Sequence, residues 1–404
     1  MRLVIIGHLL PEPASSAAGT RMLELMRLFS SFGYSITYAT AAQNVDFSVD
    51  LKDYNVAVET IELNSDRFNE QIKQLAPHVV LFDRYLTEEQ YGWRVAKECP
   101  DAVRIIDTED LHCLREARRL ALKSSREVRS EDYFNDIAKR EIAALFRADM
   151  SLMISRAEID VLTSVYNVPS SQLHYLPFLP ENVERKSPSF AERNGFMTIG
   201  NFIHPPNADS VRYLKKEIWP LIRNEFPTAK MHVYGAYPSE SIGQLNDEKT
   251  GFFVHGRAES STATFQSARV CLAPLRFGAG MKGKLLEAMV LNTPSVTTSI
   301  GAEGMHGSLN WAGAVTDDPT SFAAEAVALH NNEEAWNQAN ENGRTILTTV
   351  FDSPNHRSQF KERLTALQGG LNNHRNQNFI GQMMQFHTMR STEFMSRFIA
   401  EKNR

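Results

Sequence analysis

Short runs of aliphatic and β-branched residues alternate with helical patterns along most of this chain, and the alternation begins twice. The first series opens with the run 3–7 and the second with the run 196–200, and each leads into a loop that contains glycine. Strands that are apolar on both faces belong to parallel sheets covered by helices. We therefore predict two open α/β sheets in series, with ligands bound at the carboxyl ends of their strands.

The expected strands are the apolar runs between these helical patterns. Apolar residues recur at helical spacing between Met22 and Phe32, and again between Val211 and Ile222. We take the run 150–154 as the last strand of the first half. The expected strands are 3–7, 35–39, 79–82, 103–107 and 150–154 in the first half, and 196–200, 230–235, 252–256, 270–274 and 295–298 in the second.

Domain boundaries are predicted from a break in the pattern and from the chain length. At 404 residues the chain is too long for one average domain, and the stretch 177–194 is rich in proline and charge without periodicity. This stretch is the expected linker. We assign 1–185 to an N-terminal domain, 186–368 to a C-terminal domain and 369–404 to a helical tail that packs back on the body.

The tail differs in composition, being rich in Asn, Gln, His and Met. Apolar residues from Phe379 to Ile399 recur at spacings of three to four, which predicts two amphipathic helical pieces. Packing against the body is the expected role of their apolar faces. The alternative is a face that docks on a partner or a membrane.

Composition and charge exclude several classes of protein. A net charge of −5 and a pI near 6.2 do not fit a nucleic-acid binder. Three scattered cysteines without C-x-x-C spacing predict neither a disulfide framework nor a structural zinc site. No apolar run reaches the roughly 18 residues that span a bilayer, and the apolar N-terminus is too short for a signal peptide. We expect a cytoplasmic protein.

A helical stretch between Arg115 and Arg140 is rich in arginine and lysine but is interrupted by acidic residues. Mixed signs of charge predict a solvated face. The alternative is contact with an anionic lipid surface or a phosphorylated acceptor. Peripheral attachment to the inner face of a membrane therefore stays open.

The segment 274–289 carries the clearest chemical signal. An expected strand ends near Pro274, a turn with three glycines follows, and a helix opens near Gly283. Glycines let backbone N–H groups approach a ligand, and a helix N-terminus attracts anions. Arg276, Lys282 and Lys284 add cations, so the segment predicts a diphosphate site. The alternative is a surface helix with an ion pair between Lys284 and Glu287, three residues apart.

Two candidate sites in the first half follow expected strands. The first is Gly19-Thr20-Arg21, where a capped helix start with a solvated arginine is the alternative. The second is the acidic cluster that ends at His112. A histidine or carboxylate there can orient a substrate or accept a proton, while local loop hydrogen bonds are the alternative. The cluster contains Asp107, Glu109, Asp110 and His112. His204, before two prolines, either lines the site or stabilises a turn.

Together, the segments 199–207, 274–289, 293–296 and 301–304 resemble the donor-binding half of glycosyltransferase family 4, over about residues 196–365. The resemblance implies a GT-B fold, with two Rossmann-like domains facing an interdomain cleft, and retention of anomeric configuration. It places a nucleotide-diphosphate sugar in the second half and the acceptor in the first. Many members carry two glutamates eight positions apart. Glu287 matches the second, but Ala279 stands at the first.

The resemblance also implies roles for individual residues. Lys284, with Arg276 or Lys282, would meet the diphosphate, Glu287 the ribose, and the main chain near Ala279 would replace the missing glutamate. The expected catalytic residues are His112, Asp110 and Lys284. The expected donor-binding residues are Gly200, Asn201, Arg276, Gly278, Ala279, Gly280, Lys282, Lys284 and Glu287, and the expected acceptor-side residues are Gly19, Thr20 and Arg21.

The expected function is transfer of a sugar from a UDP- or GDP-linked donor to a carbohydrate or lipid-linked acceptor with retention. By analogy with similar proteins, a cell-surface polysaccharide or a lipid-linked oligosaccharide is the default expectation. Neither a metal nor a cofactor is expected, because the sequence has no Asp-x-Asp pair and fixed cations can stabilise a departing diphosphate. The alternatives are a nucleotide-sugar epimerase or phosphorylase on the same scaffold, and a non-catalytic nucleotide-sugar-binding protein. The oligomeric state is open.

Overall fold

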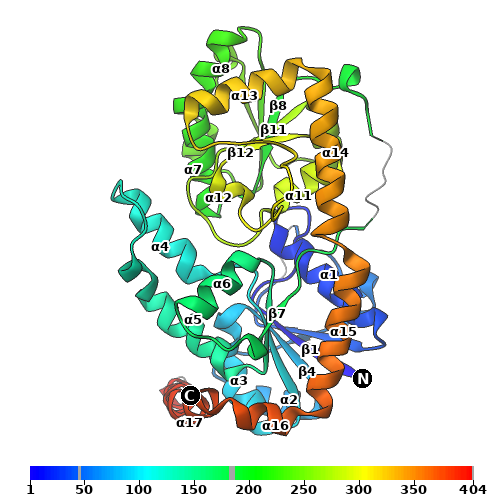
Figure 1. Cartoon of the computed structure of the whole chain (residues 1–404). Helices are drawn as coiled ribbons and strands as arrows, with labels where there is room; N and C mark the ends of the chain where they lie inside the picture. Colours follow the sequence, from blue (N-terminus) through cyan, green and yellow to red (C-terminus); the bar gives the residue numbers. More distant parts are fainter. Residues whose placement is uncertain (44–46, 182–186, 403–404) are drawn as a thin grey trace.

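The computed structural model describes residues 1–43, 47–181 and 187–402. It contains two α/β halves, one above the other in Figure 1, each built around its own parallel sheet. The chain returns from the second half to the first through two long helices on one side of the molecule, α14 (Glu333–Thr349) and α15 (Ser353–Gly369). Of the expected linker, residues 182–186 lie outside the described residues.

The first half is built on seven parallel strands in the order β3-β2-β1-β4-β5-β6-β7. Leu3 of β1 pairs with Ile36 on one side and with Val79 on the other. The strands are β1 (Arg2–Gly7), β2 (Ser35–Thr40), β3 (Val56–Thr60), β4 (Val79–Asp83), β5 (Val103–Asp107), β6 (Met150–Met153) and β7 (Leu173–Tyr175).

Helices cover both faces of this sheet. The first, α1, is capped by Ser16, whose hydroxyl accepts a hydrogen bond from the backbone N–H of Gly19 at 3.0 Å. The helices are α1 (Ala17–Ser31), α2 (Arg67–Leu75), α3 (Arg84–Glu98), α4 (His112–Lys123), α5 (Asp136–Arg147) and α6 (Arg156–Ser164).

The second half is built on six parallel strands in the order β10-β9-β8-β11-β12-β13. The expected helix between Val211 and Ile222 is α7 and α8 joined by a π-helical segment, Leu214–Ile218. The strands are β8 (Phe196–Ile199), β9 (Met231–Tyr234), β10 (Phe252–Gly256), β11 (Val270–Ala273), β12 (Ser295–Thr297) and β13 (Gly313–Val315). The helices before α14 are α7 (Pro205–Tyr213), α8 (Trp219–Glu225), α9 (Glu240–Gly243), α10 (Ser261–Ser267), α11 (Gly283–Val290), α12 (Ser299–Ala302) and α13 (Pro319–Asn331).

The prediction that 150–154 is the last strand of the first half was wrong, because β7 follows it. Two further strands, β3 and β13, were not expected. β3 buries only Val56 and exposes its other four residues, so it lacks the apolar run of a central strand. β7 and β13 have three residues each, too few for a periodic signal.

The segment after the second half packs on the first. Phe360, Leu364 and Leu367 of α15 lie in the same hydrophobic cluster as Leu3 and Phe29 of the first half. The rings of Phe360 and Phe29 meet edge to face at a centroid distance of 5.5 Å. The packing thus assigns α15 to the first half, whereas the sequence-based boundary at 368 placed it in the second.

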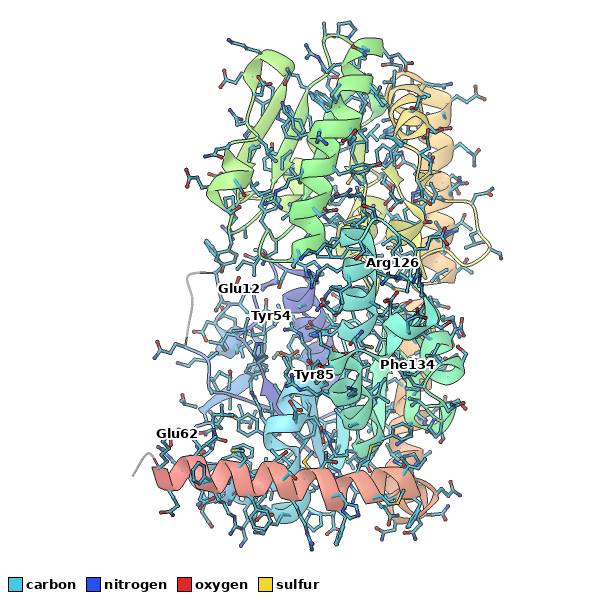
Figure 2. The ribbon with its side chains drawn as sticks, turned by 90° about the vertical axis from the view of Figure 1, so that its left-hand side faces the viewer. Glu12, Tyr54, Glu62, Tyr85, Arg126 and Phe134 are labelled. Carbon is cyan, nitrogen blue, oxygen red and sulfur yellow. The ribbon has the colours of Figure 1, made fainter. Side chains whose placement is uncertain are left out.

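Two helices form the tail, α16 (Leu371–Gln377) and α17 (Phe379–Lys402). Figure 2 shows α17 lying across the base of the first half, at the end of the molecule remote from the second half. Met389 is buried, Ser396 accepts a hydrogen bond from Arg94, and Gln385 accepts one from Arg104. The opposite face exposes large apolar side chains, among them Phe394 and Phe398. Within the described ranges, no helix combines the length and apolar character needed to span a bilayer.

Candidate active site

The glycine-rich segment of the second half lies against the first half. β11 ends at Ala273 and α11 begins at Gly283, as the sequence predicts. Gly280, between them, has a φ of +62°, a conformation that favours glycine. A Cβ atom on Gly280 would stand 2.8 Å from the Cβ of Asp110, so only glycine lets this turn approach the acidic cluster so closely.

The two halves also share apolar and charged contacts at this junction. Ala279 packs in a hydrophobic cluster of the first half, and Ile154 of the first half packs with Met281 of the second. Arg118 of α4 donates to the carbonyl of Gly278 at 2.8 Å and pairs with both oxygens of Glu303 at 2.6 and 2.8 Å. The predicted diphosphate segment therefore lies at the junction of the two halves and not on the outer surface.

Lys284, near the beginning of α11, lies next to Gly200, the residue that follows β8. The Nζ atom of Lys284 donates to Oδ1 of Asn207 at 2.8 Å, and Nδ2 of Asn207 donates to the carbonyl of Asn201 at 2.9 Å. A Cβ atom on Gly200 would stand 2.9 Å from Nζ of Lys284. The lysine can occupy this position because residue 200 has no side chain. The structure thus brings three expected donor-binding residues together, Gly200, Asn201 and Lys284.

The other two expected cations have protein partners. Arg276 forms a two-point ion pair with Asp209 at 2.5 and 2.9 Å, and its guanidinium lies 4.7 Å from the ring centre of Tyr213. Lys282 donates to the carbonyls of Ala279 and Gly280, at 3.2 and 2.5 Å, within its own loop. Arg276 is therefore turned toward α7, and Lys282 fixes the shape of the turn.

Burial changes the ionisation of three residues in α11 or directly before it. Desolvation lowers the pKa of Lys284 to about 8, and it also lowers the pKa of Lys282 to about 8 against the attraction of Glu303. Both lysines are thus largely protonated at neutral pH and hold concentrated positive charge. Burial raises the pKa of Glu287, while a hydrogen bond with Ser261 opposes the shift.

Asp110 and His112 form a pair at the start of α4. Nε2 of His112 lies 3.4 Å from Oδ1 of Asp110, whose other oxygen pairs with Arg115. Burial lowers the pKa of His112 to about 4, so the imidazole is neutral at physiological pH. Burial alone would raise the pKa of Asp110, but Arg115, His112 and His204 hold it well below its usual range. The pair thus combines a permanent carboxylate with a neutral imidazole.

His204 belongs to the same group of side chains, although it comes from the second half. Burial lowers its pKa to about 4, Asp110 opposes the shift, and Arg115, Lys284 and Lys282 add to it. It therefore lies within electrostatic reach of both the first-half cluster and the lysines of the second half. Of the two interpretations left open for His204, the placement favours the one that lines the site.

The Gly19-Thr20-Arg21 segment has a mainly structural environment. Arg21 is 1% exposed, pairs with Asp107 at 3.2 Å and donates to the carbonyl of Pro177 at 2.8 Å. A Cβ on Gly19 would collide with the backbone of Glu12 at 2.4 Å. Thr20 is exposed and donates to the carbonyl of Pro13 at 3.3 Å. The solvated arginine of the alternative interpretation was wrong, and a buried Arg21 can position the sheet edge but cannot touch an acceptor.

A partly buried ion pair joins the acidic cluster to the residue that follows β4. Arg84, which follows β4, pairs with Glu109 at 2.5 Å, and both residues have positive φ, at +68° and +58°. Desolvation raises the pKa of Glu109 to about 8 against the attraction of Arg84. Non-glycine residues in this strained region persist where the surroundings impose them, often beside functional sites.

A cavity of about 700 Å³ opens at the carboxyl ends of β2 and β3 in the first half. Its lining is mixed apolar and polar, and Glu62 is the one charged residue that lines it among the described residues. The lining residues are Leu10, Thr40, Ala41, Ala42, Gln43, Val58, Thr60, Ile61, Glu62 and Leu63.

Sequence reasoning missed several residues of the junction. Arg118 was counted in a solvated basic face, yet it holds Gly278 and Glu303. Glu158 follows the β6 strand in an S-x-x-E pattern that signals a local helix cap. Its carboxylate instead accepts hydrogen bonds from Leu111 and Gly280, in different halves. Such partners are set by tertiary packing, which local spacing does not reveal.

No group of three or more His, Cys, Asp and Glu side chains is arranged to hold a metal ion in the part of the chain that the structure describes. From the sequence we expected neither a metal nor a cofactor. Both expectations stay predictions that a chelation experiment tests.

The comparisons with known proteins bear on the family and on the fold. Residues 193–332 match the family model described as "Glycosyl transferases group 1". An uncharacterized 44.6 kDa protein in the cps region of Klebsiella pneumoniae is 24% identical over 223 residues, which cover 53% of this chain and 55% of that protein. The matched segment thus spans about half the length of that relative.

Solved structures share the architecture of the whole chain. Sucrose-phosphate synthase from Thermosynechococcus elongatus superposes with a TM-score of 0.68 at 14% identity, covering 92% of this chain and 100% of that one. HepE of Anabaena, in complex with UDP-glucose, superposes with a TM-score of 0.67 at 11% identity, covering 91% and 100%. The two sheets and the helical tail form a GT-B fold, as predicted.

Proposed function

We propose, from the premise that residues 193–332 are a glycosyl transferases group 1 domain within a GT-B fold, that this protein transfers a sugar from a nucleotide-diphosphate sugar to a carbohydrate or lipid-linked acceptor. The family match identifies a glycosyltransferase. The donor, the acceptor, retention of configuration and independence of metal are parts of the proposal. The complex of HepE with UDP-glucose supports a UDP-linked donor over a GDP-linked one.

The observation that carries the proposal is the position of Lys284. Lys284 is the second residue of α11, and its ammonium group lies next to Gly200. The ammonium is also within electrostatic reach of His204, at the junction of the halves. The first N–H groups of a helix have no partner within the helix, and they attract anions. A diphosphate that took the place of Asn207 on Lys284 would meet both the ammonium and these N–H groups.

The remaining donor contacts follow from the same geometry. Glu287 lies one turn further along α11 than Lys284, where its carboxylate can accept hydrogen bonds from a ribose diol. Arg276 supports the site indirectly, because its pair with Asp209 fixes the start of the loop against α7. Gly278, Ala279 and Gly280 contribute main-chain groups to the turn, with no side-chain carboxylate at 279.

Catalysis is proposed to rest on stabilisation of the leaving diphosphate. Fixed cations and N–H groups at a helix end stabilise charge that develops on the leaving group, and removal of one such donor costs about 3–4 kcal/mol. Lys284 is the principal candidate for this role, with Lys282 shaping the turn around it. The proposal assigns the fixed cations a task that a divalent ion performs in other transferases.

His112 and Asp110 are proposed to act on the sugar and acceptor side. A neutral imidazole can accept a hydrogen bond or a proton from a hydroxyl group. Asp110 orients the ring through Nε2 and stays ionised because Arg115 pairs with it. The acceptor is proposed to approach from the cavity at β2 and β3, whose largely uncharged lining suits a carbohydrate.

The proposal is tested by nucleotide release from a panel of UDP- and GDP-sugars, with and without EDTA, and Lys284→Ala as the site variant. Release that survives EDTA and falls at least about 100-fold in Lys284→Ala supports it. Ala279 favours one second candidate, a non-catalytic nucleotide-sugar binder. Tight nucleotide binding without turnover of any donor would establish that candidate instead.

A further inference from the structure

One carboxylate oxygen joins the two halves of the protein. Glu158 lies in α6 of the first half, and its Oε1 accepts a hydrogen bond from the backbone N–H of Gly280, in the second half, at 2.8 Å. The same oxygen accepts from the N–H of Leu111 at 2.7 Å. Leu111 caps α4, so the next residue, His112, is the first residue of that helix. Glu158 therefore bonds at once to the diphosphate segment and to the turn that carries the proposed acid–base pair.

The second oxygen of Glu158 is poorly satisfied. Glu158 is fully buried, and Oε2 has no hydrogen-bond partner among the described residues. Burial raises its pKa to about 8, with Asp110 adding to the shift, while the Leu111 N–H, Lys282 and the Gly280 N–H oppose it. Burial of a carboxyl group with an unpaired oxygen lowers the stability of the fold. The presence of such a group in a native structure therefore calls for a reason other than stability.

The other N–H groups at the start of α4 are held separately. Glu141 of α5 accepts from the N–H groups of His112 and Cys113, at 3.0 and 2.9 Å. Glu141 thus caps α4 within the first half. Among the described residues, Glu158 is the side chain that bonds to backbone groups of both this helix start and the second half. A Cβ atom at Gly280 would stand 2.8 Å from the Cβ of Asp110, so the loop has no room to shift inward.

We infer that Glu158 is a positioning residue for the transfer reaction: it sets the distance between the Gly280 turn and the His112 helix when the two halves are closed. The inference rests on the proposed function. If the halves separate, the bond to Gly280 breaks and the bond to Leu111 stays, since Glu158 and Leu111 belong to the same half. The contact therefore forms only in the closed arrangement, where donor and acceptor groups meet.

Loss of Glu158 should therefore affect turnover of the donor much more than binding of the nucleotide. The proposed side-chain contacts of the nucleotide, Lys284 and Glu287, lie on α11 beyond the Gly280 turn, so loss of Glu158 should change nucleotide affinity little. The sugar would still be held by the second half, but it would no longer be aligned with the His112–Asp110 pair of the first half. A misplacement of about 1 Å at a reacting centre costs on the order of 100-fold in rate.

The test compares Glu158→Ala, Glu158→Gln and the control Glu116→Gln, in the full-length protein. We expect Glu158→Ala to lower kcat about 100-fold with the Kd for UDP changed less than about threefold. Glu158→Gln, whose carbonyl oxygen still accepts both bonds, should recover most of kcat. Glu116→Gln should keep kcat and the KM for the donor near the wild-type values, because its carboxylate pairs with Arg119 within α4 itself.

A second measurement does not depend on activity. Small-angle scattering with saturating UDP should show a larger radius of gyration for Glu158→Ala than for wild type, and a wild-type value for Glu158→Gln. Equal radii, a Glu158→Ala variant with wild-type kcat, or a Glu116→Gln variant with the same kcat loss would overturn the inference. If no donor is turned over by the wild type, the proposed function fails while the scattering comparison still decides the role of Glu158.

Discussion

Gly283 and Ala17 meet across the junction of the two halves, each as the first residue of its helix. A Cβ atom on Gly283 would stand 2.7 Å from the Cβ of Ala17, closer than two carbon atoms can pack. Figure 1 shows α1 and α11 at the level where the halves meet. The absence of a side chain at 283 thus lets the predicted anion-binding helix end approach the helix that follows β1.

Gly283→Ala should separate these helix starts. Neither Cβ atom can rotate away, so the new methyl group forces a shift between the halves, with a cost of about 1–3 kcal/mol for overpacking. We expect a fall in kcat of about 10-fold or more, measured by nucleotide release, with UDP affinity changed less. Gly243→Ala is the control, because a Cβ there meets nothing within 4 Å. Equal kcat for both variants would refute the tight contact at 283.

Arg21→Ala should strongly destabilise the first half. Arg21 and Asp107 are both buried, and removal of the arginine leaves the carboxylate without its counter-charge. Breaking a buried pair in this way typically costs about 3–5 kcal/mol. Urea unfolding measures the loss, with the neighbouring Thr20→Ala, an exposed position, expected within about 0.5 kcal/mol of wild type. A loss below about 1 kcal/mol for Arg21→Ala would contradict this account of the pair.

Much of the fold could be predicted because central parallel strands are apolar on both faces. Every expected strand is present within a residue or two at its ends, from β1 to β12. The strands that were missed lie away from the centres of the sheets: β3 and β13 are edge strands, and β7 is the last strand of its sheet. An edge strand buries one side at most, so its sequence lacks the continuous apolar run on which the prediction depends.

The parts of the site that the sequence predicts are those where the space at a position allows only glycine. Glycine at 200, 280 and 283 leaves a signal in the sequence because any side chain there would collide with a neighbour. Arg21 and Arg276 left a misleading signal, since an arginine near a loop looks the same whether it binds a ligand or a carboxylate of the protein. Asp107 and Asp209, the partners of these two arginines, are 86 and 67 residues away in the sequence. Only the fold could reveal those pairs.

Nucleotide affinity should fall as the pH rises through about 8. The proposed contact of the diphosphate is protonated Lys284, whose pKa burial lowers to about 8, and burial lowers the pKa of Lys282 nearby to about 8 as well. Each proton lost above its pKa weakens binding by up to about tenfold per pH unit. Calorimetry from pH 7 to pH 9 measures the trend. Lys284→Arg keeps its charge over this range and should show a shallower slope. An unchanged slope would exclude Lys284 as a diphosphate contact.

The tail offers a matched pair of methionines on one helix. Met389 of α17 is 4% exposed against the body, whereas Met395 is 59% exposed on the opposite side. Met389→Ala should lower the free energy of unfolding by about 2–5 kcal/mol, as for other buried methionines. Met395→Ala should change it by less than about 0.5 kcal/mol. Similar small effects would show that α17 does not pack on the first half in solution.

Glu287 provides the sharpest test of the donor assignment, because its proposed partner is the ribose alone. The carboxylate is largely buried, which raises its pKa, and its hydroxyl partner Ser261 leaves capacity to accept further hydrogen bonds. Hydrogen bonds to a charged group contribute about 1.5–3 kcal/mol, so Glu287→Ala should raise the Kd for UDP by about 10- to 100-fold.

At a UDP concentration about 100 times the wild-type Kd, the wild type gains about 2.7 kcal/mol of stability. The variant should gain roughly half of that or less. Glu325→Ala, at an exposed position on α13 of the same half, is the control and should gain as much as the wild type. If Glu287→Ala gained as much as Glu325→Ala, the ribose would lie elsewhere, and the orientation of the nucleotide along α11 would have to be reversed.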